Sequence, residues 1–239
     1  MYSGNNPLKW FDPDGLKPTL KEAALIANDV YNDISKAYLA GGWRRVNIQS
    51  EIALNQSSSG FKSAIYGRWD AKRKKYTEYV YATAGTDFTS LNDWQNNIEQ
   101  LLGTSEQYNL SVDNAKQIDQ YFINSELTFV GHSLGGGLAS ANSLSTGRDA
   151  ITFNAAGLSN ATKKNLNLNS RGTIDAYVVS GEALNIVQQM IGMKAEGNIH
   201  KLKVPSILDA AVFMLHNNLG NVLWSSWKHT MNCVNYILK

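Results

Sequence analysis

The residue of this sequence best suited to covalent chemistry is Ser133, which stands in the pentapeptide GHSLG, residues 131–135. That pentapeptide fits the G-x-S-x-G pattern of a nucleophile elbow, a sharp strand-to-helix turn that exposes the serine hydroxyl above a sheet. An apolar run precedes it, and the small-residue stretch GGGLASANS follows the serine closely. This setting favours an elbow over a glycine-rich helix start that contains a serine by coincidence. We therefore predict that Ser133 is a nucleophile.

A serine nucleophile needs a general base, and the chain offers four histidines. His132 lies inside the elbow beside the nucleophile, and we expect it to point away and pack. His200 falls at the start of a predicted strand, where a surface or core role is expected. His216 and His229 both satisfy the order serine, acid, histidine of α/β-hydrolases. We favour His229, which opens the last helical stretch after a Trp-flanked loop, and keep His216 as the alternative.

The acid of such a triad orients the imidazole and stabilises the imidazolium without becoming protonated. Glu182 comes directly after the strand predicted in TIDAYVVSG, in the loop where this acid belongs. Asp175 lies in the middle of that strand, and Asp209 lies on a later helix. Position therefore favours Glu182 as the acid.

An oxyanion hole needs two preorganised backbone N–H groups at the place where negative charge develops. The residue after the nucleophile, Leu134, supplies one of them. The second usually comes from a loop after an earlier strand, and the strand that ends at Gly85 is followed by Thr86. We predict Thr86 as the second donor and residues 87–94 as a lid over an apolar acyl site. An ordinary strand-to-helix turn with Ser90 as helix cap is compatible with this prediction.

The elements that must position these residues follow from the hydrophobic pattern. Thr19 and Glu22 form a capping box at the start of a helix that we expect to run to Gly41-Gly42. Strand-like runs around the basic turn KRKK (residues 72–75) predict an antiparallel hairpin. From residue 127 onward, short apolar strands alternate with helices, as in parallel βαβ units. The sequence therefore predicts an α/β fold with a mixed, mostly parallel central sheet flanked by helices.

Composition excludes several classes of function. The chain has 239 residues, a formal net charge of +2 and 18% charged residues, so no electrostatic footprint for nucleic acid is present. A single cysteine, Cys233, leaves no intramolecular disulfide and no zinc-type cluster. No signal peptide is evident at the start, and the apolar segment VPSILDAAVFMLH is too short and too interrupted to span a bilayer. We expect neither a metal nor a cofactor.

Several segments of the chain resemble class 3 (fungal-type) lipases: AGTDFTSLNDWQNNI, VGHSLGGGLA, ITFNAAG, VSGEALNIV and KHTMNCVNYI. In this order, the five segments are similar to the family's oxyanion and lid segment, its elbow, the strand after the elbow, the segment with its acid, and its histidine-bearing end. The resemblance implies an α/β-hydrolase fold. It also implies Ser133 as nucleophile, Glu182 as acid, His229 as base, and Thr86 and Leu134 as oxyanion donors.

The chain departs from the lipase pattern at two positions. The acid of the family is normally aspartate, whereas Glu182 is one methylene longer. The arginine that usually precedes the glycine of the oxyanion segment is replaced by Ala84. A glutamate can serve as a triad acid in this fold.

The first sixteen residues resemble the end of an Rhs-repeat core through the signature P-x-x-x-x-D-P-x-G-L, carried by Pro7, Asp12, Pro13, Gly15 and Leu16. In Rhs proteins the core forms a shell, and autoproteolysis after the terminal leucine frees a C-terminal toxin. The resemblance implies that residues 1–16 end such a core and that residues 17–239 are a lipase-like toxin. The parent core and a neutralising immunity protein are its implied partners. The alternative is that DPDGL is merely a turn.

These expectations combine into one hypothesis. The chain is a secreted Rhs-associated toxin, delivered into a target cell as part of a larger protein. It hydrolyses carboxylic esters of membrane phospholipids, as a phospholipase A does, through an acyl-serine intermediate. One alternative is a serine esterase or acyltransferase on small esters, since the acyl acceptor is set by pocket shape rather than by the triad. The other is a non-catalytic interaction module with a hydrolase fold, against which the order of serine, acid and histidine argues.

Overall fold

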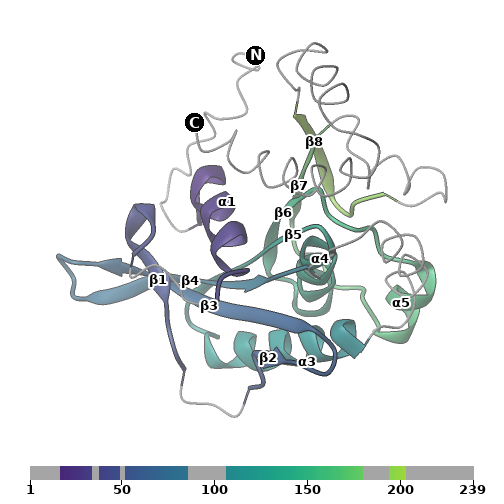
Figure 1. Cartoon of the computed structure of the whole chain (residues 1–239), viewed down its shortest axis with the longest axis horizontal. Helices are drawn as coiled ribbons and strands as arrows, with labels where there is room; N and C mark the ends of the chain where they lie inside the picture. Colours follow the sequence, from purple (N-terminus) through teal and green to yellow (C-terminus); the bar gives the residue numbers. More distant parts are fainter. Residues whose placement is uncertain (1–16, 34–37, 49–51, 86–105, 180–193, 203–239) are drawn as a thin grey trace, which may run out of the picture.

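A computed structural model describes residues 17–33, 38–48, 52–85, 106–179 and 194–202 of the chain (Figure 1). Its helices and strands occur in this order: α1 (Leu20–Asp29), the 3-10 turn η2 (Ala40–Gly42), β1 (Trp43–Arg45), β2 (Asn55–Gln56), β3 (Phe61–Asp70), β4 (Lys75–Thr83), α3 (Glu106–Tyr121), β5 (Glu126–His132), α4 (Leu134–Thr146), β6 (Asp149–Phe153), α5 (Asn160–Asn165), β7 (Ile174–Val179) and β8 (Asn198–Leu202).

The central sheet is mixed and mostly parallel, as predicted. Its strand order is β1-β3-β4-β5-β6-β7-β8, with β2 paired to β3 beside it. The β3–β4 hairpin around the basic turn is antiparallel, with a register shift between Gly67 and Trp69. From β4 to β8 each neighbouring pair is parallel. The carboxyl ends of these strands therefore meet at one edge of the sheet, where α/β proteins place their ligand sites.

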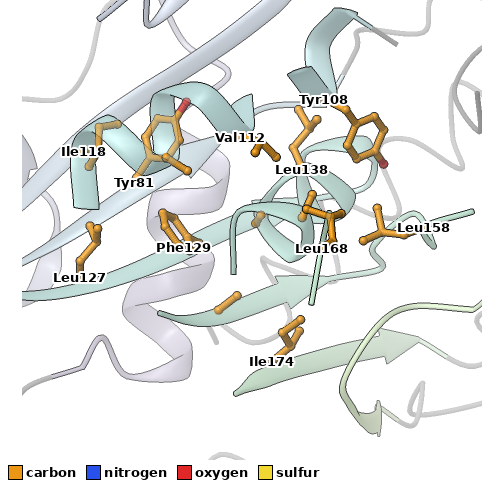
Figure 2. Packing of buried hydrophobic residues seen from close by; sticks show 14 of the residues in the cluster. Tyr81, Tyr108, Val112, Ile118, Leu127, Phe129, Leu138, Leu158, Leu168 and Ile174 are labelled. Carbon is orange, nitrogen blue, oxygen red and sulfur yellow. The ribbon is translucent and has the colours of Figure 1, made fainter. Parts of the chain in front are cut away.

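Helices cover both faces of this sheet (Figure 1). The apolar face of α1 packs against one side, in a cluster that includes Ile26, Val130 and Phe153. On the opposite side α3 and α4 pack over the strands. Figure 2 shows the core of that side, with these residues labelled: Tyr81, Tyr108, Val112, Ile118, Leu127, Phe129, Leu138, Leu158, Leu168 and Ile174. The sheet is thus the middle layer of three, as the α/β prediction requires.

The capping box predicted for α1 is present, but the helix is shorter than predicted. Thr19 Oγ1 accepts the Glu22 N–H at 3.3 Å, and the Glu22 carboxylate accepts the Thr19 N–H at 2.8 Å. The helix ends at Asp29 rather than at Gly41. Carbonyls that a longer helix would use are taken by side chains instead, since Lys62 Nζ donates to Tyr31 O at 2.6 Å and Arg45 donates to Asn32 O at 2.9 Å.

None of the helices in the described segments is long and apolar enough to cross a membrane.

Candidate active site

Ser133 occupies the tight turn between β5 and α4, the strand–turn–helix setting expected for GHSLG. Its backbone has φ 57° and ψ −127°, a region that residues with a Cβ rarely adopt. Hydrogen bonds fix this conformation: the Ser133 N–H donates to Phe153 O at 3.0 Å, and the Ser133 carbonyl accepts from Gly137 N at 3.2 Å and Ala156 N at 2.9 Å. The turn is therefore held from both β6 and α4, and the side chain remains half-exposed.

The glycines on either side of the serine are required by close backbone approach. A Cβ on Gly131 would lie 2.1 Å from Gly135 O, and a Cβ on Gly135 would lie 2.2 Å from Thr83 O. Both distances are far inside van der Waals contact. The first turn of α4 therefore rests directly on β5 and on the end of β4, which brings the neighbourhood of Ser133 to the β4 carboxyl end.

Leu134 and Gly85 meet at this edge. Leu134 is the first residue of α4, a position whose N–H has no acceptor within the helix. A Cβ on Gly85 would lie 3.3 Å from Leu134 N and 3.3 Å from His132 O. The end of β4 thus passes beside the Leu134 N–H, while the proposed second donor, Thr86, lies outside the described residues.

His132 is buried beneath the elbow, with 1% of its surface exposed. Burial lowers the pKa of His132 to about 4, because the charged imidazolium would lose its hydration there. Its Nδ1 lies 3.3 Å from the Tyr31 hydroxyl, while its Nε2 has no hydrogen-bond partner within the described part of the chain. The ring is therefore neutral and belongs to the packing under the turn, as expected for it.

His200 is paired with Asp175 rather than with Ser133. Its Nε2 lies 2.8 Å from Asp175 Oδ1, and its ring stacks on Tyr177 with centroids 4.8 Å apart. Asp175 is near the amino end of β7, whereas the elbow lies at the carboxyl edge of the sheet. This pair holds the outer strands β7 and β8 together.

Glu182, His229, His216 and Thr86 lie outside the described residues, as do residues 87–94. Their assignments stay predictions. The structure describes the strands that lead towards two of them: β4 reaches Gly85 just before Thr86, and β7 ends at Val179 shortly before Glu182. Because both strands are parallel to β5, both chains leave the sheet at the edge that carries Ser133.

Tyr31 also lies at this site, although no sequence motif predicts it there. Its hydroxyl accepts the Gly85 N–H at 2.9 Å and lies 3.3 Å from the carbonyl oxygen of His132. In the sequence Tyr31 is one member of a helical stripe, and no local motif distinguishes it. Only the packing of α1 over the ends of β4 and β5 brings it here.

Within the described segments, no group of three or more His, Cys, Asp or Glu side chains is arranged to hold a metal ion.

Comparison with known proteins places the chain among lipolytic proteins. The family model of the Tle-like phospholipase domain matches residues 22–222. An extracellular phospholipase A1 of Serratia liquefaciens is 37% identical over 153 residues, which are 61% of this chain and 44% of that relative. The chain thus spans less than half the length of the curated relative that it matches.

Solved structures with a similar fold are fungal lipases. A triacylglycerol lipase from Penicillium expansum superimposes with a TM-score of 0.52 at 16% identity, covering 78% of this chain and 79% of that one. A Rhizomucor miehei lipase with its propeptide gives a TM-score of 0.51 at 11% identity, covering 81% of this chain and 68% of that one. At such identities the likeness shows the fold: a mostly parallel sheet with flanking helices, as in the α/β-hydrolases.

Proposed function

The chain belongs to the family of Tle-like phospholipase domains, and from that premise we propose that it hydrolyses the carboxylic esters of membrane phospholipids at Ser133. The observation that carries the proposal is the backbone of Ser133, held in a left-handed conformation between a buried strand and a helix start. Its Serratia relative is a phospholipase A1, which supports attack at the sn-1 ester.

The reaction proceeds in two acyl-transfer steps. Ser133 Oγ attacks the ester carbonyl carbon while His229 accepts the hydroxyl proton, and the resulting oxyanion is stabilised by the N–H groups of Leu134 and Thr86. Glu182 holds the imidazolium. The C–O bond to glycerol breaks, and the lysophospholipid alcohol leaves with the proton from His229. Water then loses a proton to His229 and attacks the acyl-serine, which releases the fatty acid and restores Ser133.

Product analysis on vesicles of a defined phospholipid tests this proposal. We expect the wild-type protein to release the sn-1 fatty acid and an sn-2 acyl lysolipid from a lipid with palmitate at sn-1 and oleate at sn-2. In H₂¹⁸O the released acid should carry one ¹⁸O, since water is the acyl acceptor. Ser133→Ala should abolish the release. Ser145→Ala, at the far end of the same helix, is the matched control and should retain it.

Each outcome of that experiment points to a different function. Release of oleate with palmitoyl lysolipid would move the attack to sn-2. Transfer of the acyl group to an added alcohol without ¹⁸O uptake would favour an acyltransferase. Absence of any lipid product, together with no labelling of Ser133 by a fluorophosphonate, would overturn the enzymatic proposal in favour of an interaction module.

The base and the acid are tested by separate substitutions. We propose that His229→Ala lowers kcat by about 10⁴-fold or more, as loss of a triad member does, while His216→Ala leaves it nearly unchanged. Full activity in His229→Ala would transfer the role to His216. Glu182→Gln should lower kcat strongly with little change in KM, because the carboxylate acts on the imidazolium that forms during the reaction.

We also propose that residues 17–239 are delivered as the toxin part of a longer Rhs protein and are cleaved from it after Leu16. The support is the signature at Pro7, Asp12, Pro13, Gly15 and Leu16, followed at once by the capped start of α1. Expression of the parent protein and intact mass measurement of its fragments should give a fragment that begins at Lys17. Co-expression of candidate immunity proteins should identify one that binds this fragment and restores growth.

A further inference from the structure

We infer that Tyr31 is a positioning residue of the proposed oxyanion hole, which fixes Gly85 at the end of β4 beside the Leu134 N–H. The inference rests on the proposed hydrolase function. It adds to the site a residue just beyond the C-terminus of α1, far from the elbow in sequence. Three observations lead to it: how the end of β4 is held, what the Tyr31 hydroxyl binds, and how Tyr31 itself is held.

Successive backbone N–H groups at the end of β4 donate hydrogen bonds to neighbouring parts of the fold. The Ala84 N–H donates to Lys62 O at 2.9 Å, which continues the pairing with β3. The Gly85 N–H, which has no strand partner among the described residues, donates to the Tyr31 hydroxyl at 2.9 Å. The next N–H along the chain is that of Thr86, the proposed oxyanion donor. Tyr31 therefore holds the last amide before the donor.

The Tyr31 hydroxyl connects this amide to the elbow. It accepts from Gly85, and its oxygen lies 3.3 Å from two atoms of one residue, His132 O, to which it donates, and His132 Nδ1. A Cβ on Gly85 would lie 3.0 Å from Tyr31 Oη and 3.3 Å from Leu134 N, so both groups border the same small space. One hydroxyl thus joins the residue before each proposed partner: Gly85 before Thr86, and His132 before Ser133.

Tyr31 is itself fixed by the strand that pairs with β4. Lys62 Nζ donates to Tyr31 O at 2.6 Å and contacts Asp33 Oδ1 at 2.6 Å. The carbonyl of the same Lys62 accepts from Ala84. Lys62, a single residue of β3, therefore binds both Tyr31 and the end of β4, which restrains the distance between them.

Loss of the hydroxyl should affect the transition state more than the bound substrate. Without it the Gly85 N–H loses its acceptor, and Gly85, which has no side chain to restrict its rotation, can shift relative to the Leu134 N–H beside it. The Thr86 N–H is needed only when the carbonyl oxygen becomes an oxyanion. The loss should therefore lower kcat and leave KM nearly unchanged.

Tyr31→Phe tests the inference on the full chain with a soluble short-chain ester. We expect kcat to fall by about 10- to 100-fold, less than or near the loss of a whole oxyanion donor, with KM within about twofold. Affinity for an alkylboronic acid, whose adduct with Ser133 places an oxygen anion in the hole, should fall by about the same factor as kcat/KM. Tyr66→Phe is the matched control, since it removes a buried hydroxyl that binds Asp29 of α1.

A second variant keeps the test decisive if Tyr31→Phe fails to fold. Lys62→Met retains the Tyr31 hydroxyl and the strand carbonyl but removes the ammonium that holds Tyr31, and it should lower kcat by about 3- to 10-fold at constant KM. The inference is overturned if Tyr31→Phe matches Tyr66→Phe in kcat and boronate affinity, or if Tyr31→Phe does not fold and Lys62→Met keeps the wild-type kcat. A wild-type protein that hydrolyses no ester would instead remove the proposed function, and this inference with it.

Discussion

At the scale of single residues, the backbone of Ser133 carries the clearest sign of function in the described part of the chain. A side chain at φ 57° and ψ −127° costs about 1–3 kcal/mol relative to an ordinary conformation. The hydrogen bonds to Phe153, Gly137 and Ala156 hold the residue there in spite of that cost. Strain of this kind persists where the exposed hydroxyl has a use, since a glycine would fit the turn without it.

Comparison of two substitutions at this position measures the strain. Ser133→Gly and Ser133→Ala both remove the hydroxyl, but only glycine relieves the left-handed backbone. We expect the free energy of unfolding of Ser133→Gly to be about 1 kcal/mol higher than that of Ser133→Ala. This difference already includes the greater entropy of glycine in the unfolded chain. Urea unfolding of the two variants checks this. Equal stability of the two would mean that the turn relaxes around an alanine at no cost.

His132 should make stability depend on pH. Its pKa of about 4 in the folded state lies below the value of about 6.5 in an unfolded chain, so the unfolded state binds more protons between these values. Stability therefore falls as the pH is lowered through this window and is fully present above it. Between pH 8 and pH 5 the contribution should be about 2 kcal/mol.

The variant His132→Asn isolates this effect. Its free energy of unfolding should fall less than that of the wild type over the same pH range, by about that amount. Parallel pH profiles of the two proteins, measured by urea unfolding, would contradict a neutral buried imidazole.

At the scale of elements, α1 is joined to the sheet by a buried ionic cluster as well as by apolar packing. Asp29, with 3% of its surface exposed, accepts from Arg45 Nε at 3.0 Å and from the Tyr66 hydroxyl at 2.8 Å. At the other end of the helix Glu22 binds Arg68 Nη2 at 2.7 Å. These contacts hold α1 against the sheet.

Asp29→Asn should therefore destabilise the fold while leaving the elbow intact. Removing the charge from a buried pair leaves Arg45 poorly compensated, and we expect a loss of about 2–3 kcal/mol in the free energy of unfolding. Asp33→Asn is the matched control on the same segment, because Asp33 is exposed and its pair with Lys62 should not contribute measurably. Chemical denaturation of both variants decides between these expectations.

The close contact of α4 with the ends of β4 and β5 leads to a second prediction at this scale. Gly135→Ala places a Cβ 2.2 Å from Thr83 O, and it should lower the free energy of unfolding by about 3 kcal/mol or more and abolish activity. Gly147→Ala, at the left-handed C-terminal cap of the same helix, meets nothing closer than 3.8 Å. It should cost only about 1 kcal/mol and keep activity. Similar losses in both would refute a steric origin.

Much of the fold could be predicted from the sequence because its signals are local. The elbow pentapeptide, the capping box at Thr19 and the alternation of strands and helices each depend on neighbouring residues. The end of α1 could not, because Lys62 and Arg45, which lie on other strands, bind the carbonyls of Tyr31 and Asn32 just beyond it. The role proposed for Tyr31 could not be predicted for the same reason, since it depends on a contact 54 residues away in sequence, at Gly85.

At the scale of the whole molecule, the parallel strands from β4 to β8 collect the chemically important chain segments at one edge. Ser133 follows β5, Gly85 follows β4, and β7 ends at Val179 on the way to Glu182. The basic turn of the β3–β4 hairpin lies at the opposite edge, because β4 runs from that turn towards Gly85. Substitutions in residues 72–75 are thus far from the proposed chemistry.

Removal of residues 1–16 tests the proposed division of the chain. The fold described here begins with Lys17, whose ammonium pairs with Asp149, and with the cap at Thr19. We expect residues 17–239 to match the full chain within about 0.5 kcal/mol in free energy of unfolding, as surface changes do, and to match it in esterase activity. A marked loss of either would show that the first sixteen residues belong to the catalytic unit.

The same α1 contacts have a consequence for how the polypeptide is made. The helix is made before the central strands, and Lys17 meets Asp149 across 132 residues, while Tyr31 meets His132 across 101. Contacts between such distant residues form only after the intervening chain exists, which slows folding. During synthesis the packing of α1 is therefore completed only when β5 and β6 have been made. The contacts of Tyr31 with Gly85 and His132 would then be late events of folding, so the proposed active site is completed only after the central strands are in place.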